Sequence, residues 1–308
     1  MVFGGNLIDI SAKIGSINMD NPTILASGIM DQDSESMKRV FENGAGSVVT
    51  KSIGLKPNKG YLNPTFVELE YGILNAMGLP NPGINEFKFE IEKLKKFKIP
   101  VIGSIFGSTS KEFIELGLDM QKFGADALEI NMSCPHAKGY GLEIGSDPKL
   151  VENILSDLKK SVDIPIFVKI SSNLTDIIEI AKIIEDVNAD GIVAINSVKS
   201  MKIDLTLKKP ILSNKIGGYS GKGIKPIGIR CVYELYENVK IPIIGVGGIT
   251  NGEDALEYIM AGASAVQIGT GLYYRGIDIF NKICDEIKSW MKDNCYEKLS
   301  DLIGVAHL

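Results

Sequence analysis

The sequence has few cysteines, and none of them form a closely spaced pair. Its four cysteines, Cys134, Cys231, Cys284 and Cys295, lie far apart in the 308-residue chain, and no CxxC pair occurs. This spacing argues against a disulfide framework, a zinc site, or an iron–sulfur cluster held by this chain alone. We therefore expect no bound metal.

The chain also lacks a basic block and a long apolar run. Lysine and arginine number 33 against 38 acidic residues, which gives a net charge of -5. Nucleic acid is therefore not an expected partner, because phosphate backbones require concentrated positive charge. No apolar stretch approaches the roughly 18 residues that a bilayer span needs, and the N-terminus does not resemble a signal peptide. These absences predict a soluble cytoplasmic protein with no membrane partner.

From residue 20 onward, short β-branched runs alternate with amphipathic stretches. The runs are mostly unbroken apolar segments, as in parallel strands that are buried on both faces. The expected strands are Thr23–Ala26, Ser47–Thr50, Pro100–Ile105, Ala127–Asn131, Pro165–Ile170, Gly191–Asn196, Pro242–Val246 and Ala265–Gly269. The expected helices include Lys111–Phe123, Pro148–Ser161, Thr175–Asp186 and Gly252–Ala261.

Eight strand–helix pairs in series predict an α/β fold, a (β/α)8 TIM barrel that forms one domain over residues 1–308. A doubly wound open sheet is the alternative. The first expected strand is followed by Ser27-Gly28, which provides no GxGxxG turn of the kind that open sheet usually carries. The pattern therefore favours the barrel.

Three segments lie outside the strand–helix repeat. Leu7–Ile10 and Ile14–Ile17 are expected to form an N-terminal β-hairpin that closes the barrel floor. The connections Lys51–Gly83 and Ser197–Gly223 are long for a compact domain, and such loops are usually functional. In a barrel both would lie on the C-terminal face, where active sites form.

Glycine is concentrated after the last two expected strands. The segments Gly245–Thr250 and Ile268–Gly271 each carry glycines that allow backbone N–H groups to converge on an anion. Barrels commonly bind phosphate at this position. The glycines predict a phosphate site, but they do not distinguish flavin mononucleotide from a sugar phosphate.

Two further residues could carry chemistry at the same face. Lys169 ends an apolar strand and needs a negative partner; it could form a Schiff base, pair with a structural carboxylate, or face a cofactor ring. Cys134 lies in a polar loop fixed by Pro135, where a thiolate could act as a base or a nucleophile.

Several segments together resemble the class 1 dihydroorotate dehydrogenases, most closely the class 1B catalytic subunit. The similarity extends over essentially the whole chain and depends on several motifs in the same order. These are Thr50-Lys51-Ser52, residues 75–81 (NAMGLPN), residues 131–135 (NMSCP), Asn196-Ser197, residues 217–221 (GGYSG) and the two glycine loops.

The resemblance implies an FMN enzyme that oxidises dihydroorotate to orotate in pyrimidine synthesis, with Cys134 as the catalytic base. The implied FMN-binding residues are Ser27, Lys51, Ser52, Asn131, Lys169, Ile195, Gly221, Gly247, Gly248, Gly269 and Thr270. The implied substrate-binding residues are Lys51, Asn75, Met77, Gly78, Leu79, Asn131, Asn196 and Ser197. In this scheme a hydride goes to flavin N5 and a proton goes to the base on the opposite side of the substrate.

The class 1B resemblance also implies a partner. The expected assembly is a homodimer bound to an electron-transfer subunit that carries FAD and an iron–sulfur cluster and passes electrons to NAD⁺, making a heterotetramer. Two residues depart from the family pattern, His136 and Ser104, where the family usually has asparagine. Both departures are similar to dihydropyrimidine dehydrogenase, so uracil or thymine reduction is the alternative activity, and a Schiff-base aldolase using Lys169 is a further one.

Overall fold

Eight parallel strands close into a barrel in the computed structural model, which describes residues 8–133, 145–174 and 176–308. Each strand coincides with one of the eight expected from the sequence, so the predicted fold class is confirmed. In barrel order from the first strand they are β3 (Thr23–Leu25), β4 (Ser47–Val49), β7 (Val101–Ile105), β8 (Ala127–Asn131), β9 (Ile166–Ile170), β10 (Gly191–Ala194), β15 (Ile243–Val246) and β16 (Ala265–Ile268).

Helices surround this barrel and cover the outward faces of its strands. Several begin at a side-chain cap: Asp33, Thr109, Asp147, Asp176 and Asn251 each accept a hydrogen bond from a backbone N–H of the first turn. The helices are α1 (Ser34–Glu42), α2 (Ile84–Lys96), α3 (Ser110–Phe123), α5 (Pro148–Lys159), α6 (Ile177–Asp186), α7 (Lys225–Asn238), α8 (Gly252–Met260), α9 (Thr270–Arg275) and α10 (Ile279–Asp293). Within the described part of the chain, no helix has the length and apolarity to cross a bilayer.

The two faces of each strand have different surroundings, which explains why the strands read as unbroken apolar runs. Alternate residues point outward and join the large core under the helices, for example Leu128, Val168 and Val266. The residues between them form a second apolar cluster inside the barrel. This inner layer contains Ile24, Val49, Ile102, Ala127, Phe167, Val193, Ile244 and Ala265.

The N-terminal hairpin closes the floor of the barrel, but its strands are not those expected. The structure pairs β1 (Ala12–Ile14) with β2 (Ile17–Met19), so the turn is Gly15-Ser16 and the predicted boundaries are wrong. Gly15 has a φ of +54°, a conformation that glycine adopts without the strain of a side chain. This turn sends Ile14, Ile17 and Met19 into the inner apolar cluster.

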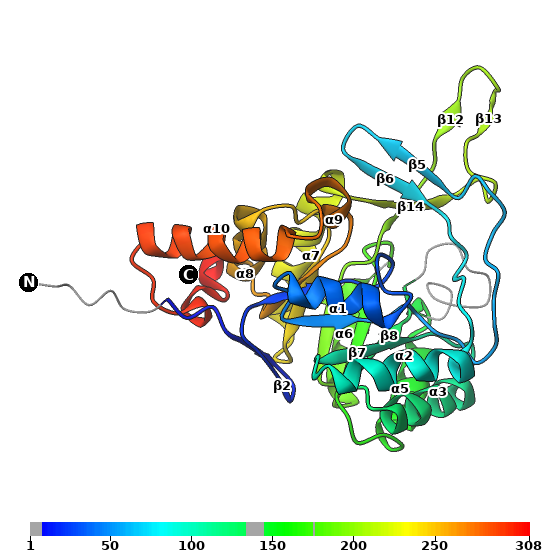
Figure 1. The fold of residues 1–308 in the computed structure, drawn as a ribbon, viewed down its shortest axis with the longest axis horizontal. Helices are drawn as coiled ribbons and strands as arrows, with labels where there is room; N and C mark the ends of the chain where they lie inside the picture. Colours follow the sequence, from blue (N-terminus) through cyan, green and yellow to red (C-terminus); the bar gives the residue numbers. More distant parts are fainter. Residues whose placement is uncertain (1–7, 134–144, 175) are drawn as a thin grey trace, which may run out of the picture.

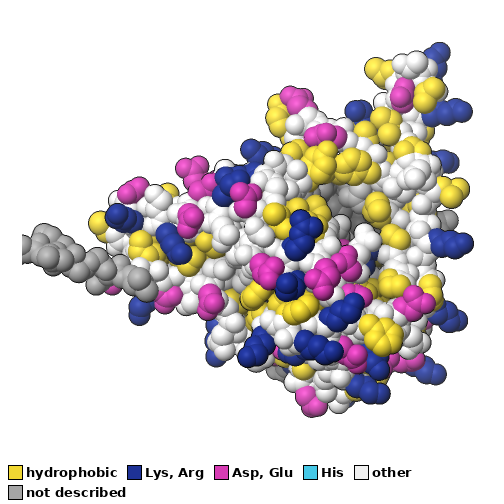
Figure 2. All heavy atoms as spheres, viewed as in Figure 1, with side chains coloured by type: hydrophobic (Ala, Val, Ile, Leu, Met, Phe, Trp, Pro, Cys, Tyr) yellow, Lys and Arg dark blue, Asp and Glu magenta, His cyan; other side chains and the backbone are white. Residues whose placement is uncertain are grey.

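The two long connections form one sheet over the C-terminal face (Figure 1). Lys51–Gly83 contributes β5 (Phe66–Leu69) and β6 (Gly72–Asn75), while Ser197–Gly223 contributes β11 (Val198–Ser200) and β14 (Gly217–Ser220), in the order β11-β14-β6-β5. The hairpin of β12 (Ile203–Asp204) and β13 (Lys209–Pro210) projects beyond this sheet (Figure 1). Figure 2 shows hydrophobic side chains gathered beside a hollow between the sheet and the barrel.

Candidate active site

A cavity of about 510 Å³ lies between the C-terminal ends of the strands and the added sheet. It falls within the range of roughly 300–1,000 Å³ that is usual for small-molecule and cofactor sites. Apart from Cys134 and Gly78, it is lined by every site residue predicted from the sequence. Those lining residues are Ser27, Lys51, Ser52, Asn75, Met77, Leu79, Asn131, Lys169, Ile195, Asn196, Ser197, Gly221, Gly247, Gly248, Gly269 and Thr270.

The two predicted residues outside this set are Gly78 and Cys134. Gly78 does not line the cavity; it has a φ of +77°, and its carbonyl accepts a hydrogen bond of 3.0 Å from Asn58 Nδ2. A Cβ at this position would lie 2.8 Å from Tyr61, so the glycine lets the loop turn between Met77 and Leu79. Cys134 and the neighbouring His136 lie outside the described residues.

The barrel repeat explains how these side chains meet. Side chains alternate along a strand, so the residue two positions after each member of the inner apolar layer also points into the barrel. Most residues in this second layer line the cavity, and Ser104 packs behind it. The layer contains Ala26, Lys51, Ser104, Glu129, Lys169, Ile195, Val246 and Gln267.

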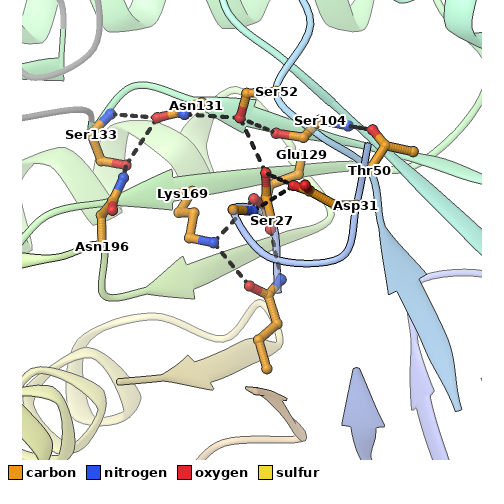
Figure 3. A network of polar contacts seen from close by, with 12 residues as sticks. Ser27, Asp31, Thr50, Ser52, Ser104, Glu129, Asn131, Ser133, Lys169 and Asn196 are labelled. Atoms are coloured by element: carbon orange, nitrogen blue, oxygen red, sulfur yellow. Dashed lines mark hydrogen bonds and ion pairs between the residues drawn. The ribbon is translucent and has the colours of Figure 1, made fainter. Parts of the chain in front are cut away.

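A chain of hydrogen bonds crosses one wall of the cavity (Figure 3). Asn131 Nδ2 donates to Ser52 Oγ at 3.1 Å, and the Ser52 hydroxyl also contacts Ser104 Oγ at 2.8 Å. Ser104 is therefore a partner of a predicted cofactor-binding residue. Its hydroxyl satisfies Ser52 at the position where the resembled family usually has asparagine.

The same chain continues to Asn196 (Figure 3). Ser133 Oγ donates to Asn131 Oδ1 at 3.3 Å and accepts from Asn196 Nδ2 at 2.9 Å. Asn196 Oδ1 in turn accepts from the backbone N–H of Ser197 at 2.7 Å. The two asparagine amides are thus fixed in orientation at the cavity wall, although Asn131 ends β8 and Asn196 follows β10.

The buried Lys169 has two partners that sequence reasoning missed. Its Nζ lies 3.2 Å from Glu129 Oε1 and donates to Gln267 Oε1 at 3.0 Å. Gln267 Nε2 donates to Glu129 Oε2 at 2.6 Å, which closes the three side chains into a ring. Of the roles left open for Lys169, the structure shows the pair with a carboxylate. A polar residue inside each apolar run, Glu129 in β8 and Gln267 in β16, was the available signal.

A second buried carboxyl group lies behind the loop after β3. Asp31 is fully buried, and its Oδ2 accepts from the Gly28 N–H at 2.5 Å and from Ser27 Oγ at 3.4 Å. Burial raises the pKa of Asp31, while the positive charge of Lys51 acts in the opposite direction. Asp31 thereby holds the Ser27-Gly28 turn at the cavity edge (Figure 3).

Glycine-containing loops after β14, β15 and β16 bring backbone close to the cavity. Gly221 and Gly248 have φ values of +99° and +74°, and a Cβ on Gly248 would lie 2.8 Å from the Gly221 carbonyl oxygen. Thr270 Oγ1 donates to Ser220 Oγ at 2.9 Å, which ties the last glycine loop to the added sheet. By contrast, a Cβ on Gly28 would meet nothing within 4 Å, so open space adjoins that turn.

The cysteines that are described lie away from this chemistry. Burial raises the pKa of the thiols of Cys231 and Cys284 to about 11, so both remain protonated at neutral pH. Cys295 is exposed and follows α10. Over residues 8–133, 145–174 and 176–308, no cluster of three or more His, Cys, Asp or Glu side chains could hold a metal ion.

Comparison with known proteins agrees with this geometry. Residues 10–291 match the family model described as dihydroorotate dehydrogenase. The chain is 54% identical over 302 residues to the dihydroorotate dehydrogenase B (NAD(+)) catalytic subunit of Methanocaldococcus jannaschii, covering 97% of this chain and 98% of the relative. It is 50% identical to the protein of the same name from Thermoplasma acidophilum, covering 97% and 99%.

Proposed function

We propose, because this chain belongs to the dihydroorotate dehydrogenase family, that its cavity holds FMN and dihydroorotate together and oxidises dihydroorotate to orotate in pyrimidine synthesis. The whole chain would act as one FMN-binding domain in the cytoplasm. The observation that carries the proposal is the cavity itself, because it collects nearly all the residues that the sequence motifs single out. These residues come from seven of the eight barrel strands or the loops that follow them, and from the added sheet.

The residues present fit a flavin phosphate. The backbone around Gly247-Gly248 and Gly269-Thr270 would hold the phosphate, since closely approaching N–H groups bind anions well. Ser27, Ser52, Asn131, Ile195 and Gly221 would bind the rest of the cofactor. Lys169 would place a buried positive charge against it.

The substrate would be held by side chains whose orientation is already fixed. Asn131 and Asn196 are linked through Ser133, so their amides can pair with the edges of a pyrimidine ring without being reordered. Asn75, Ser197 and the Met77–Leu79 turn would enclose the ring. Lys51 would pair with the substrate carboxylate.

The reaction removes a proton from C5 of dihydroorotate and a hydride from C6. We propose Cys134 as the base, which takes the C5 proton as its thiolate becomes a thiol. FMN, when bound, supplies the acceptor for the two electrons and the proton carried by the hydride. Lys169 would then offset the negative charge that accumulates on the acceptor.

The geometry of Lys169 also bears on the aldolase alternative. A Schiff base forms when the amine nitrogen attacks a carbonyl carbon, whereas the Nζ of Lys169 is held by buried hydrogen bonds to Glu129 and Gln267. The family match likewise supports a redox reaction. Lys169 therefore serves the proposed function as a fixed cation.

Substrate choice tests the proposal directly. Dihydroorotate is expected to reduce the bound flavin at least about 100-fold faster than dihydrouracil, because Lys51 would otherwise lose its carboxylate partner in the cavity. Stopped-flow absorbance near ~450 nm follows the flavin. A Lys51→Met variant should lose most of this preference. Faster reduction by dihydrouracil would reverse the assignment in favour of uracil reduction.

We further propose that electrons leave through a second subunit. Both relatives named above are called catalytic subunits of an NAD(+) enzyme, and such a name implies a partner. The proposed assembly is a homodimer of this chain in a heterotetramer with a subunit that carries FAD and an iron–sulfur cluster. The scattered cysteines of this chain leave too few ligands for such a cluster.

Acceptor specificity checks the need for that subunit. The isolated chain is expected to pass electrons from dihydroorotate to an artificial dye but not to NAD⁺. Adding an electron-transfer subunit of the proposed type should restore NAD⁺ reduction. Brisk turnover of the isolated chain with NAD⁺ or with fumarate would remove the need for a partner.

A further inference from the structure

We infer that Glu129 and Gln267 are positioning residues that set the direction of the Lys169 ammonium and the net charge around it, and through it the preference of the site for reduced over oxidised FMN. The inference rests on the proposed function, since it concerns the cofactor that the cavity would hold. Its basis is the closed ring of hydrogen bonds that joins these three side chains on the cavity floor.

The ring leaves Lys169 one free direction. An ammonium group has three N–H donors. Among the described residues, Glu129 and Gln267 take two of them, at 3.2 and 3.0 Å. Because Lys169 lines the cavity, the third donor is available to an acceptor atom of a molecule bound there. Lys169 is thus directed by two neighbours that are themselves joined at 2.6 Å.

The ring also balances charge. Lys169 and Glu129 are 6% and 1% exposed, so their opposite charges interact with little screening by water. The pair is neutral in sum, and neutral Gln267 shares both partners. The floor therefore presents a hydrogen-bond donor whose positive potential is reduced by the carboxylate behind it.

The strands hold this arrangement in place. Glu129 is on β8, Lys169 is on β9 and Gln267 is on β16, which lies on the far side of the barrel from β8 and β9. The ring thus spans the barrel interior directly above the apolar layer. Burying three polar groups there costs free energy that well-packed apolar side chains would not. An apolar layer would close the barrel as well, so the polar ring points to a ligand above it.

The predicted effect of the ring depends on the charge that FMN gains when it is reduced. Two electrons and one proton added to FMN leave one additional negative charge on the flavin, while two electrons and two protons leave none. A more positive charge around Lys169 stabilises the flavin that carries the additional negative charge. It therefore strengthens the binding of reduced FMN relative to oxidised FMN. Removing the Glu129 charge and adding a charge at Gln267 should therefore shift the preference in opposite directions.

The test measures FMN affinity in both oxidation states for Glu129→Gln and Gln267→Glu, with dithionite as the reductant. Glu129→Gln is expected to raise the ratio of oxidised to reduced dissociation constants about tenfold or more, and Gln267→Glu to lower it by a similar factor. Tenfold corresponds to about 30 mV in the midpoint potential of a two-electron couple. Gln121→Glu on α3, which makes the same charge change outside the cavity, should leave the ratio unchanged.

The opposite signs separate positioning from damage to the fold. For each variant the inference requires one direction of change in the ratio of dissociation constants. Either variant therefore tests the inference if the other does not fold. Shifts in the same direction, or ratios within threefold of wild type in a folded variant, would overturn it. A wild-type chain that binds no FMN would overturn the proposed function as well, whereas wild-type binding with unmoved ratios would overturn the inference alone.

Discussion

The Cys134→Ala variant is expected to be reduced by dihydroorotate about 10²–10⁴-fold more slowly than the wild-type chain, with FMN still bound. Alanine cannot take the C5 proton, whereas the residues proposed to bind the cofactor are unchanged. Stopped-flow absorbance of the flavin measures the rate, and the flavin-to-protein ratio measures binding. Unchanged reduction kinetics would assign Cys134 a structural role.

Two further cysteine variants sharpen this result. Cys134→Ser should recover some activity only at high pH, because the proton of a hydroxyl is harder to remove than that of a thiol. Cys295→Ala is the matched control, since Cys295 is exposed and does not line the cavity. Its rate should equal that of the wild-type chain.

A Gly248→Val variant is expected to lose FMN and to purify as a colourless protein. The Cβ alone would lie 2.8 Å from the Gly221 carbonyl oxygen and 2.9 Å from Lys225 Cβ. The valine would therefore push the Gly247-Gly248 loop, which is proposed to hold the phosphate, away from the Gly221 loop, which is proposed to bind another part of the cofactor. Absorbance near ~450 nm and the FMN released on denaturation measure occupancy.

Gly276 provides the control for backbone strain. Its φ of +77° is close to the +74° of Gly248, yet a Cβ there would meet only Asp278 Oδ1 at 3.5 Å. Gly276→Val therefore suffers similar conformational strain outside the cavity and should keep its FMN. Full flavin occupancy in Gly248→Val would refute the proposed phosphate site.

The sequence alone located the barrel and the face that carries the site. Each of the eight strands is a local apolar run, and a parallel strand with both faces buried needs no distant residue to be recognised. Because all eight strands end at one face, the residues following them had to converge there. The glycines at 247, 248 and 269 and the polar ends at Lys51, Asn131, Lys169 and Asn196 could thus be assigned to one cavity.

The hairpin boundaries and the sheet over the cavity were decided only by the tertiary structure. The apolar residues Ile14 and Ile17 read equally well as one strand, and only the barrel floor shows that both point inward across a Gly15-Ser16 turn. Strand β14 pairs with β6, from a connection more than a hundred residues earlier, with Gly218 opposite Asn75. Pairing between distant segments depends on where the barrel places their ends, and no local pattern encodes it.

The partners of Lys169 were decided in the same way. The sequence showed that a lysine ending an apolar strand needs a negative partner, but Glu129 and Gln267 are 40 and 98 residues away along the chain. Each lies between apolar residues of its strand, where its side chain could face a helix or the barrel interior. In the closed barrel, the side chains of Lys169, Glu129 and Gln267 all point into the barrel interior. The ammonium, the carboxylate and the amide therefore lie together above the apolar layer and form hydrogen bonds with one another.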